Sequence, residues 1–328
     1  MRVILITGAA GFIGSHFTRY ILNHFPLVKV VGFDKLTYAG SMDNLADCVT
    51  NPNFTFVRGD IADPVAIKSV LTEHQITEIV NFAAETHVDR SIAGPAEFIH
   101  TNVNGTQILL DLAMRHNIQK FVHMSTDEVY GDLPYEADFG YRFTEFSPLN
   151  PSSPYSASKA SADLLILAWK RTYKFPVSIV RSSNVFGSHQ HREKLIPTLI
   201  SSLCQNVPFK LYGDGRNMRD WVWVGDVCVA IDRVLHQGTP GEIYNIGGIQ
   251  VLSNITVANG IGHMYCAKFR PDFNEIWPIT FIEDRPGHDR MYAMNWNKIN
   301  SHLGWEPTKT LWEEIPNLIN WYAKNPAR

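Results

Sequence analysis

Short runs of β-branched and aromatic residues alternate with longer amphipathic stretches through the first half of the chain. The runs predict strands and the amphipathic stretches predict helices. Strands are expected at 3–6, 28–33, 54–57, 79–82, 121–124 and 177–180. Helices are expected at about 12–24, 63–74, 97–116 and 155–173.

Regular alternation of strands and helices implies right-handed crossovers and a parallel sheet with helices on both faces. The expected class is α/β, a Rossmann-type doubly wound sheet with a smaller mixed α/β lobe. This alternation stops after about residue 183, which divides the chain into a first domain at 1–182 and a smaller lobe at 183–328. A helix at 226–235 and a strand at 242–246 make the stretch at about 221–250 a candidate to return to the first domain.

Composition narrows the class of protein. The 328 residues are 45% apolar and 19% charged, which is typical of a globular chain of about two domains. A net charge of −3 provides no excess of positive charge for binding nucleic acid or an anionic membrane. No apolar run approaches the roughly 20 residues of a membrane-spanning helix. The four scattered cysteines form no CxxC pair, which favours reduced thiols in a cytoplasmic protein.

A glycine-rich turn follows the first expected strand and enters the first expected helix. Glycines at 8, 11 and 14 allow a tight turn and close approach of the backbone to a pyrophosphate. Asp34 ends the second strand, 20 residues after Gly14, where a carboxylate can accept hydrogen bonds from a ribose diol. That carboxylate would repel a 2′-phosphate, so the sequence favours NAD over NADP. The neighbouring Lys35 weakens this preference slightly.

Tyr155 and Lys159 lie four residues apart and therefore share one face of an expected helix. Tyrosine is a poor base at neutral pH, but a nearby ammonium and a positive nicotinamide ring favour its phenolate. Such a tyrosine can take a hydroxyl proton while hydride leaves the same carbon.

Thr126, Asp127 and Glu128 come directly after the expected strand at 121–124. Parallel sheets bind ligands at the carboxyl ends of their strands, so these side chains should border the site. Thr126 can bond a substrate hydroxyl. Two adjacent carboxyl groups can supply an acid and a base if their environments separate their pKa values.

Together these segments resemble the nucleotide-diphosphate-glucose 4,6-dehydratases, most closely the dTDP-glucose type, within the extended short-chain dehydrogenase/reductase superfamily. The resemblance runs nearly end to end. The narrowest motifs are Ser125-Thr126-Asp127-Glu128-Val129-Tyr130-Gly131 and Ser153-Pro154-Tyr155-Ser156-Ala157-Ser158-Lys159-Ala160. Others are Asp34-Lys35-Leu36-Thr37, Glu193-Lys194-Leu195-Ile196-Pro197, Arg219-Asp220-Trp221 and Asp284-Arg285-Pro286-Gly287-His288.

The resemblance implies a hydro-lyase that uses NAD without net redox change. Tyr155, with Lys159, removes the C4 hydroxyl proton during oxidation at C4. Glu128 then removes the C5 proton while Asp127 protonates the departing C6 hydroxyl, hydride returns to C6, and C5 is reprotonated. The product is a 4-keto-6-deoxy nucleotide sugar.

The resemblance also assigns binding residues and an assembly state. The family's members commonly dimerise through the helix pair at about 97–116 and 155–173, which implies a homodimer. The implied cofactor contacts, besides Tyr155 and Lys159, are Gly8, Gly11, Phe12, Ile13, Gly14, Asp34, Lys35, Leu36, Thr37, Asp60, Ile61, Phe82, Ala83, Ala84, Thr86 and Thr101. The implied substrate contacts are Thr86, Thr126, Asn184, Glu193, Lys194, Leu195, Lys210, Tyr212, Arg219, Asn254, Arg285 and His288.

Three questions stay open at this point. Val185 stands where bacterial members often have a cofactor-contacting asparagine, so the nucleotide base, thymine or uracil, is unsettled. Sugar-nucleotide 4-epimerases and decarboxylases share the glycine turn and the Tyr-Lys pair but do not need Asp127 and Glu128, and a non-catalytic NAD-binding protein would tend to lack Tyr155. His189 and His191 have no third ligand at useful spacing, so no metal is expected.

Overall fold

The computed structural model describes residues 2–133, 140–273 and 275–325. Its centre is a seven-stranded sheet in the order β10-β6-β5-β4-β1-β2-β3, and every pairing in it is parallel. The Rossmann-type α/β class expected from the alternation is therefore confirmed. The strands are β1 (Val3–Thr7), β2 (Lys29–Asp34), β3 (Phe54–Arg58), β4 (Glu78–Asn81), β5 (Lys120–Thr126), β6 (Val177–Ser182) and β10 (Ile243–Ile246).

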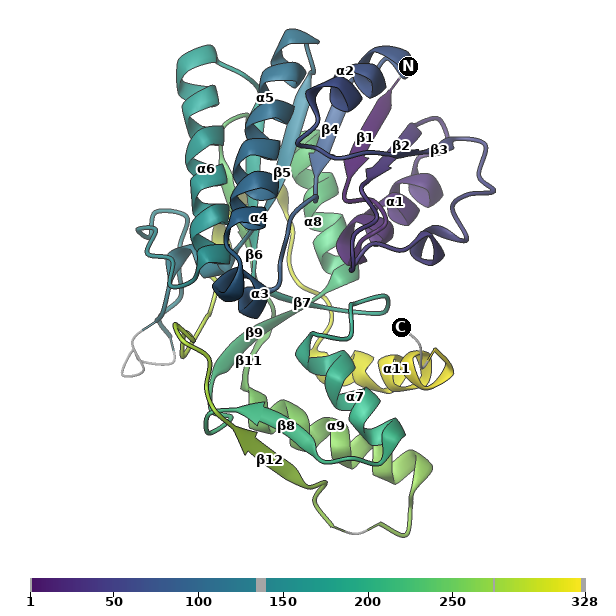
Figure 1. Cartoon of the computed structure of the whole chain (residues 1–328), viewed down its shortest axis with the longest axis vertical. Helices are drawn as coiled ribbons and strands as arrows, with labels where there is room; N and C mark the ends of the chain where they lie inside the picture. The colour runs from purple at the N-terminus through teal and green to yellow at the C-terminus, as the bar shows by residue number, and fades with distance from the viewer. Residues whose placement is uncertain (1, 134–139, 274, 326–328) are drawn as a thin grey trace.

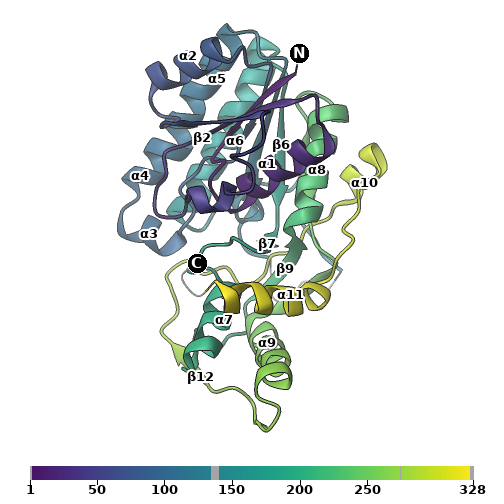
Figure 2. The same cartoon turned by 90° about the vertical axis from the view of Figure 1, so that its right-hand side faces the viewer.

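Helices cover both faces of this sheet (Figures 1 and 2). One face packs against α1 (Phe12–His24) and α8 (Val224–Gln237), which also contact each other. The opposite face packs against α2 (Pro64–Glu73), α5 (Thr106–Arg115) and α6 (Pro154–Tyr173). Alternate residues of each buried strand feed these two apolar clusters, as the two-residue period of a strand requires.

Helix α6 begins and ends where its sequence dictates. Ser153 and Ser156 form a reciprocal capping box, and Pro154 occupies the first helical position, where its missing N–H costs nothing. The helix ends at Lys174, which adopts a left-handed conformation with φ of 58°. This start fixes the turn that carries Tyr155 and Lys159.

The prediction of a single helix at 97–116 is wrong in detail. The structure has α4 (Ala96–Phe98), a π-helical segment η2 (Ile99–Gly105) and then α5. The wider π turn holds Asn102 against the chain after β4. Its amide accepts a bond from the N–H of Glu85 (2.8 Å) and donates to the Glu85 carbonyl (3.0 Å) and to Ser158 Oγ (2.9 Å). These tertiary bonds override the α-helical period that the sequence suggests.

The second lobe is built on two small sheets, one of order β11-β9-β7 and one pairing β12 with β8. They comprise β7 (Asn184–Phe186), β8 (Phe209–Tyr212), β9 (Met218–Trp223), β11 (Gln250–Ser253) and β12 (Ile279–Ile282). Helices α7 (Leu195–Gln205), α9 (Asn254–Phe269) and α11 (Leu311–Lys324) enclose the apolar cluster of this lobe, and α10 (Asn297–Leu303) packs on α8 and β10.

The stretch at 221–250 divides between the two lobes. Helix α8 and strand β10 lie with the large sheet, whereas Trp221–Trp223 belong to β9 of the second lobe. Residue 1 and residues 326–328, the two ends of the expected domain division, lie outside the described residues. Among the residues that are described, no helix is long and apolar enough to cross a bilayer.

Candidate active site

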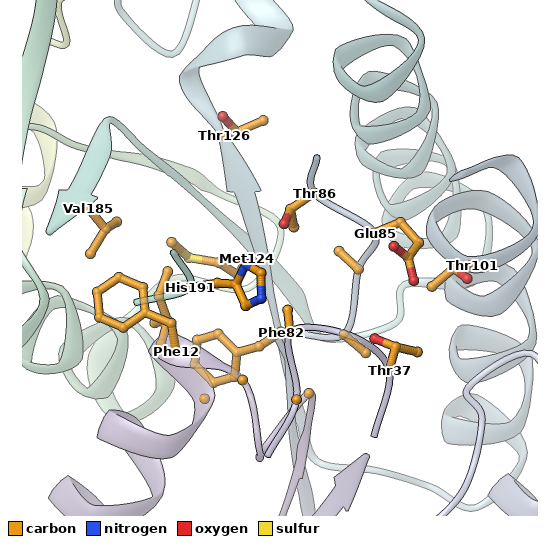
Figure 3. A pocket seen from close by; sticks show the side chains of 18 of the residues that line it. Phe12, Thr37, Phe82, Glu85, Thr86, Thr101, Met124, Thr126, Val185 and His191 are labelled. Carbon is orange, nitrogen blue, oxygen red and sulfur yellow. The ribbon is translucent and has the colours of Figure 1, made fainter. Parts of the chain in front are cut away.

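A cavity opens at the carboxyl ends of the strands, where the second lobe approaches the large sheet. It holds about 1560 Å³ of empty space, its open mouth included. Phe82 and Met124 lie near its centre, with Thr37, Glu85 and Thr101 at one side and Phe12 and Val185 at the other (Figure 3). Parallel sheets place ligands at this end of their strands.

The glycine turn forms one end of the cavity. Gly8 has φ of +66°, and a Cβ there would lie 2.7 Å from the backbone nitrogen of Ala83. A Cβ on Gly14 would lie 2.1 Å from the Gly8 carbonyl oxygen. Neither position can carry a side chain, so the turn stays thin and α1 starts close to the sheet.

Asp34 holds this turn from the end of β2. Its carboxylate accepts bonds from the N–H groups of Ala10 (2.9 Å) and Leu36 (2.8 Å), while burial raises its pKa. Lys35 lies 2.8 Å from the Asp60 carboxylate. Because Lys35 is paired with Asp60, its charge does not compensate the Asp34 carboxylate. The negative charge of Asp34 would repel a 2′-phosphate, so the site favours a ribose without one.

Two carboxyl groups and a hydroxyl meet beyond the end of β5. Thr126 Oγ1 donates to Asp127 Oδ1 (3.1 Å) and accepts from the Glu128 N–H (3.3 Å). The 3-10 turn η3 (Asp127–Tyr130) is anchored by Tyr130, whose hydroxyl donates to Asn245 (2.8 Å) and accepts from Arg181 (2.9 Å). The two carboxyl groups are thus fixed to the strand end and to the core.

Different neighbouring groups shift the pKa values of these two carboxyl groups. Burial, and next the charge of Glu128, raise the pKa of Asp127 well above its ordinary value. Burial also raises the pKa of Glu128, but Arg285, Lys194 and Arg219 oppose that rise. The rise is therefore opposed by cations at Glu128 but not to the same extent at Asp127, which favours Asp127 as the acid and Glu128 as the base of such a pair.

Tyr155 and Lys159 both line the cavity from α6. Tyr155 is hydrogen-bonded to Thr126, and its ring packs edge-on against Phe98. The lowered tyrosine pKa expected from the sequence is not found in the protein alone, because burial and then Glu128 raise it well above its ordinary value. Lys159 Nζ is directed instead to the Met124 carbonyl (2.7 Å) and His123 Nε2 (3.1 Å), and burial lowers its pKa to about 8.

The structure brings most of the expected site residues to this one cavity. Besides Tyr155 and Lys159, the lining residues are Gly8, Gly11, Phe12, Ile13, Gly14, Asp34, Lys35, Thr37, Asp60, Ile61, Phe82, Ala83, Ala84, Thr86, Thr101, Thr126, Asp127, Glu128, Asn184, Glu193 and Lys194. Leu36 lies outside it: its N–H bonds Asp34, and its side chain packs on the core.

A second group of expected residues lies outside the cavity, on the second lobe. Lys210 and Tyr212 lie on β8, Arg219 on β9, Leu195 and Asn254 at the starts of α7 and α9, and Arg285 and His288 after β12. Tyr212 faces His288 across 6.1 Å, and its hydroxyl donates to Asp89 (3.0 Å) on α3 (Val88–Ala93) of the large domain. Arg285 also reaches Asp89 at 4.0 Å. Tyr212 and Arg285 therefore meet the large domain at α3.

Several cavity residues were not among the expected contacts. Met124, Ser182, Ser183, Gln190 and His191 line it as well. Ser182 and Ser183 follow β6, so the strand-end rule that located Thr126 would have found them. His191 instead depends on the path of the loop after β7, where it packs on Tyr38 and lies 3.4 Å from Glu193.

Unpartnered polar atoms face a ligand-sized space. Ser125 Oγ, Asp127 Oδ2, Ser183 Oγ and Asn184 Oδ1 are buried without a hydrogen-bond partner among the described residues, and all four residues line the cavity. Buried polar atoms are normally satisfied, so these four indicate a polar ligand. The thin glycine turn and fixed Asp34 suit a dinucleotide at the other end.

Comparison with known proteins agrees with this geometry. Residues 5–317 match the family model described as GDP-mannose 4,6 dehydratase. A dTDP-glucose 4,6-dehydratase of Streptomyces antibioticus is 44% identical over 99% of this chain and 93% of its own length. The dTDP-glucose 4,6-dehydratase DesIV of Streptomyces venezuelae, solved with NAD bound, superposes with a TM-score of 0.92 at 41% identity and covers 99% of this chain and 98% of its own. A UDP-glucose 4-epimerase of Thermotoga maritima superposes with a TM-score of 0.88 but is 25% identical, covering 99% of each chain.

Proposed function

We propose that this chain, which belongs to the nucleotide-sugar 4,6-dehydratase family, converts dTDP-glucose to its 4-keto-6-deoxy derivative with NAD as cofactor. The observation that carries the proposal is the pair Asp127 and Glu128 beside Tyr155 in one cavity, with cations opposing the raised pKa of Glu128. An epimerase or a decarboxylase needs the tyrosine but not the carboxyl pair. The lower identity to the epimerase agrees with this choice.

NAD, when bound, supplies a hydride acceptor at C4 of the sugar and a hydride donor at C6. The residues that would hold it are those of the glycine turn, Asp34 at the adenosine ribose, and Tyr155 with Lys159 at the nicotinamide end. The cavity joins both ends in one continuous space, which suits an extended dinucleotide.

The protein's own groups handle the protons. Tyr155, which is hydrogen-bonded to Thr126, takes the C4 hydroxyl proton. Glu128, whose carboxylate three nearby cations favour against the effect of burial, takes the C5 proton, which the neighbouring ketone acidifies. Asp127 gives its proton to the departing C6 hydroxyl, because burial has kept that proton on the carboxyl group. Water leaves, and Glu128 would return its proton to C5 as C6 receives hydride, so the reaction has no net redox change.

The second lobe is proposed to hold the nucleotide. Arg219 and Arg285 suit a pyrophosphate, because a guanidinium matches phosphate oxygens at two points. Both act on the charge of Glu128, which indicates that they lie near the reacting end of the cavity. Lys194 joins the lobes by donating to the Thr86 carbonyl (3.1 Å). On this proposal the nucleotide is held by residues after the division at about residue 183, whereas the catalytic residues precede it.

The direct test uses the purified protein with dTDP-glucose and with UDP-glucose in separate incubations. We expect a 4-keto-6-deoxy product from dTDP-glucose, identified by mass and by the absorbance of the ketone in alkali. A larger yield from UDP-glucose would reassign the nucleotide. Inversion at C4 without loss of water would replace the dehydratase by an epimerase.

Changing Asp34 to alanine should weaken NAD binding and relax the preference for NAD over NADP. The carboxylate both faces the ribose and bonds Ala10, so its loss removes a ligand contact and loosens the glycine turn. Dissociation constants for NAD and NADP, measured by calorimetry on both proteins, report the change. Asp43→Ala, on the 3-10 turn η1 (Met42–Leu45), is the control for a nearby acidic side chain. Equal affinity of the unmodified protein for both cofactors would contradict the assignment.

The protein is further proposed to be a cytoplasmic homodimer. Leu109 is fully buried, but Ile99 on η2 and Leu164 on α6 are 45% and 58% exposed, which leaves an apolar surface over the helix pair. A twofold copy would cover that surface. Light scattering should give a dimer at micromolar concentration, and Leu164→Arg should shift it toward monomer. A monomer in the unmodified protein would refute this. The described cysteines are all free, as a reducing compartment allows.

A further inference from the structure

A row of buried polar side chains crosses the sheet beneath the site. Thr7, Asn81 and His123 are direct register partners on β1, β4 and β5, and none of them is exposed. Thr7 Oγ1 lies 2.5 Å from Asn81 Oδ1, Asn81 Nδ2 lies 3.0 Å from His123 Nδ1, and His123 Nε2 lies 3.1 Å from Lys159 Nζ. The row therefore leads from the residue before Gly8 to the catalytic lysine.

A neutral imidazole has one donor and one acceptor nitrogen, and both nitrogens of His123 are engaged. Burial, and next the charge of Lys159, keep the pKa of His123 well below its ordinary value, so the ring is neutral. Its two hydrogen bonds must then run in the same direction along the row. If Asn81 donates to Nδ1, Nε2–H must donate to Lys159, which is then an amine. If Lys159 donates as an ammonium, Nδ1–H must donate to Asn81.

Asn81 can serve either arrangement, because turning its amide exchanges the oxygen and the nitrogen. In the second arrangement its NH₂ group donates to Thr7 Oγ1, an atom that can also accept. Each charge state of Lys159 thus has its own complete set of hydrogen bonds. An ammonium in this site donates to the Met124 carbonyl and to His123, and its third N–H is free for a ligand in the cavity.

We infer that His123 is a positioning residue, which accepts a hydrogen bond from the Lys159 ammonium through Nε2 and is held in the required tautomer by Asn81 and Thr7. The inference rests on the proposed function, because the Lys159 ammonium matters to catalysis only if Tyr155 must become a phenolate. His123 touches neither substrate nor cofactor in this scheme. It acts through Lys159.

Other charges around Lys159 are accounted for within the described residues. Asp163, one turn further along α6, raises the pKa of Lys159 but is itself bound by Arg181 of β6 (2.8 Å). On α5, Asp111 pairs with Arg115, and on β4, Glu78 pairs with Arg2. Other titratable groups on the elements packed here include Tyr155 of α6, His100 of η2, and Asp127, Glu128 and Tyr130 of η3. His123 is the group in direct contact with the ammonium.

Three substitutions separate the hydrogen bond from simple packing. His123→Phe keeps a ring but removes the acceptor, so the Lys159 pKa should fall and Tyr155 should lose its proton only at higher pH. The rising limb of the pH profile for C4 oxidation should move up by about one unit, a tenfold loss at pH 7. His123→Gln can place an amide oxygen near the Nε2 position and should restore the profile. His123→Asn can reach Asn81 but not Lys159, and should behave like the phenylalanine variant.

Each possible outcome either supports the inference or overturns it. A uniform loss of rate with an unmoved profile in His123→Phe, or a glutamine variant as impaired as the asparagine variant, would overturn the inference. A second readout does not depend on the substrate: the titration of Lys159 Nζ by NMR in protein labelled with ¹⁵N-lysine, assigned with Lys159→Met. We expect a lower pKa in His123→Phe and a near-normal one in His123→Gln. An unchanged pKa would refute the inference even if the proposed substrate proved wrong.

Discussion

Replacing Tyr155 by phenylalanine is expected to slow turnover by roughly 10²–10⁴-fold and to leave substrate binding nearly unchanged. The ring is 7% exposed and packs with Val88 and Phe98, so phenylalanine keeps the packing and removes only the hydroxyl. Without the hydroxyl no group at that place takes the C4 proton. Single-turnover absorbance of the reduced cofactor measures the step directly.

The pH dependence of this oxidation is the companion measurement. In the protein alone, burial and Glu128 raise the pKa of Tyr155, so the phenolate is scarce and oxidation should rise with pH. Bound NAD brings a positive ring, which should move that ionisation below the pKa of free tyrosine. Tyr173→Phe, at the exposed end of the same helix, is the matched control. If Tyr155→Phe kept near-normal turnover, another group would have to take the C4 hydroxyl proton. The assignment of Tyr155 and Lys159 would then be wrong.

Glu128→Gln is expected to stop the reaction after its first half. Glutamine keeps the size of the side chain but cannot accept the C5 proton, so elimination should slow by roughly 10²–10⁴-fold. Oxidation at C4 should stay largely intact, because Tyr155 and Lys159 are unchanged. Reduced cofactor should therefore build up in a single turnover and persist, whereas the unmodified enzyme consumes it.

Glu128 also helps to raise the pKa of Tyr155, so its removal should ease C4 oxidation slightly. This gives the variant a second signature: a rising limb displaced to lower pH. Glu73→Gln, at the end of α2, controls for loss of a carboxylate elsewhere. Elimination of water by Glu128→Gln at the normal rate would show that another group is the C5 base.

Much of the large domain could be predicted because its strands are buried on both faces. Helix α1 begins and ends where the pattern placed it, and the six expected strands fall within two residues of those found. The sequence of the second lobe contains weaker signals of secondary structure. Strands β7, β8 and β11 have only three or four residues, too few to establish a period, and β9 pairs with partners on either side of it in the chain.

The site divides in the same way. The position of Thr126, Asp127 and Glu128 follows from one topological rule, because all three come at the end of a parallel strand. The direction of the Lys159 side chain does not, since a long flexible chain goes where its tertiary partners lie. His123 reads in the sequence as one polar residue inside a strand. Its role emerges only when Asn81 and Thr7 are found beside it on the neighbouring strands.

Strand β10 pairs with β6 and covers its free edge. During translation, β6 leaves the ribosome well before β10 is synthesised. Strands β7, β8 and β9 and helix α7 of the second lobe are synthesised in between. Until α8 and β10 emerge, the nascent sheet has an unpaired edge, and the face under α1 lacks Val227 and Ile231. Open edges of this kind pair with other chains. Translation pauses or insertions between residues 183 and 242 should therefore lower the yield of native protein, and a fragment that stops at residue 182 should aggregate.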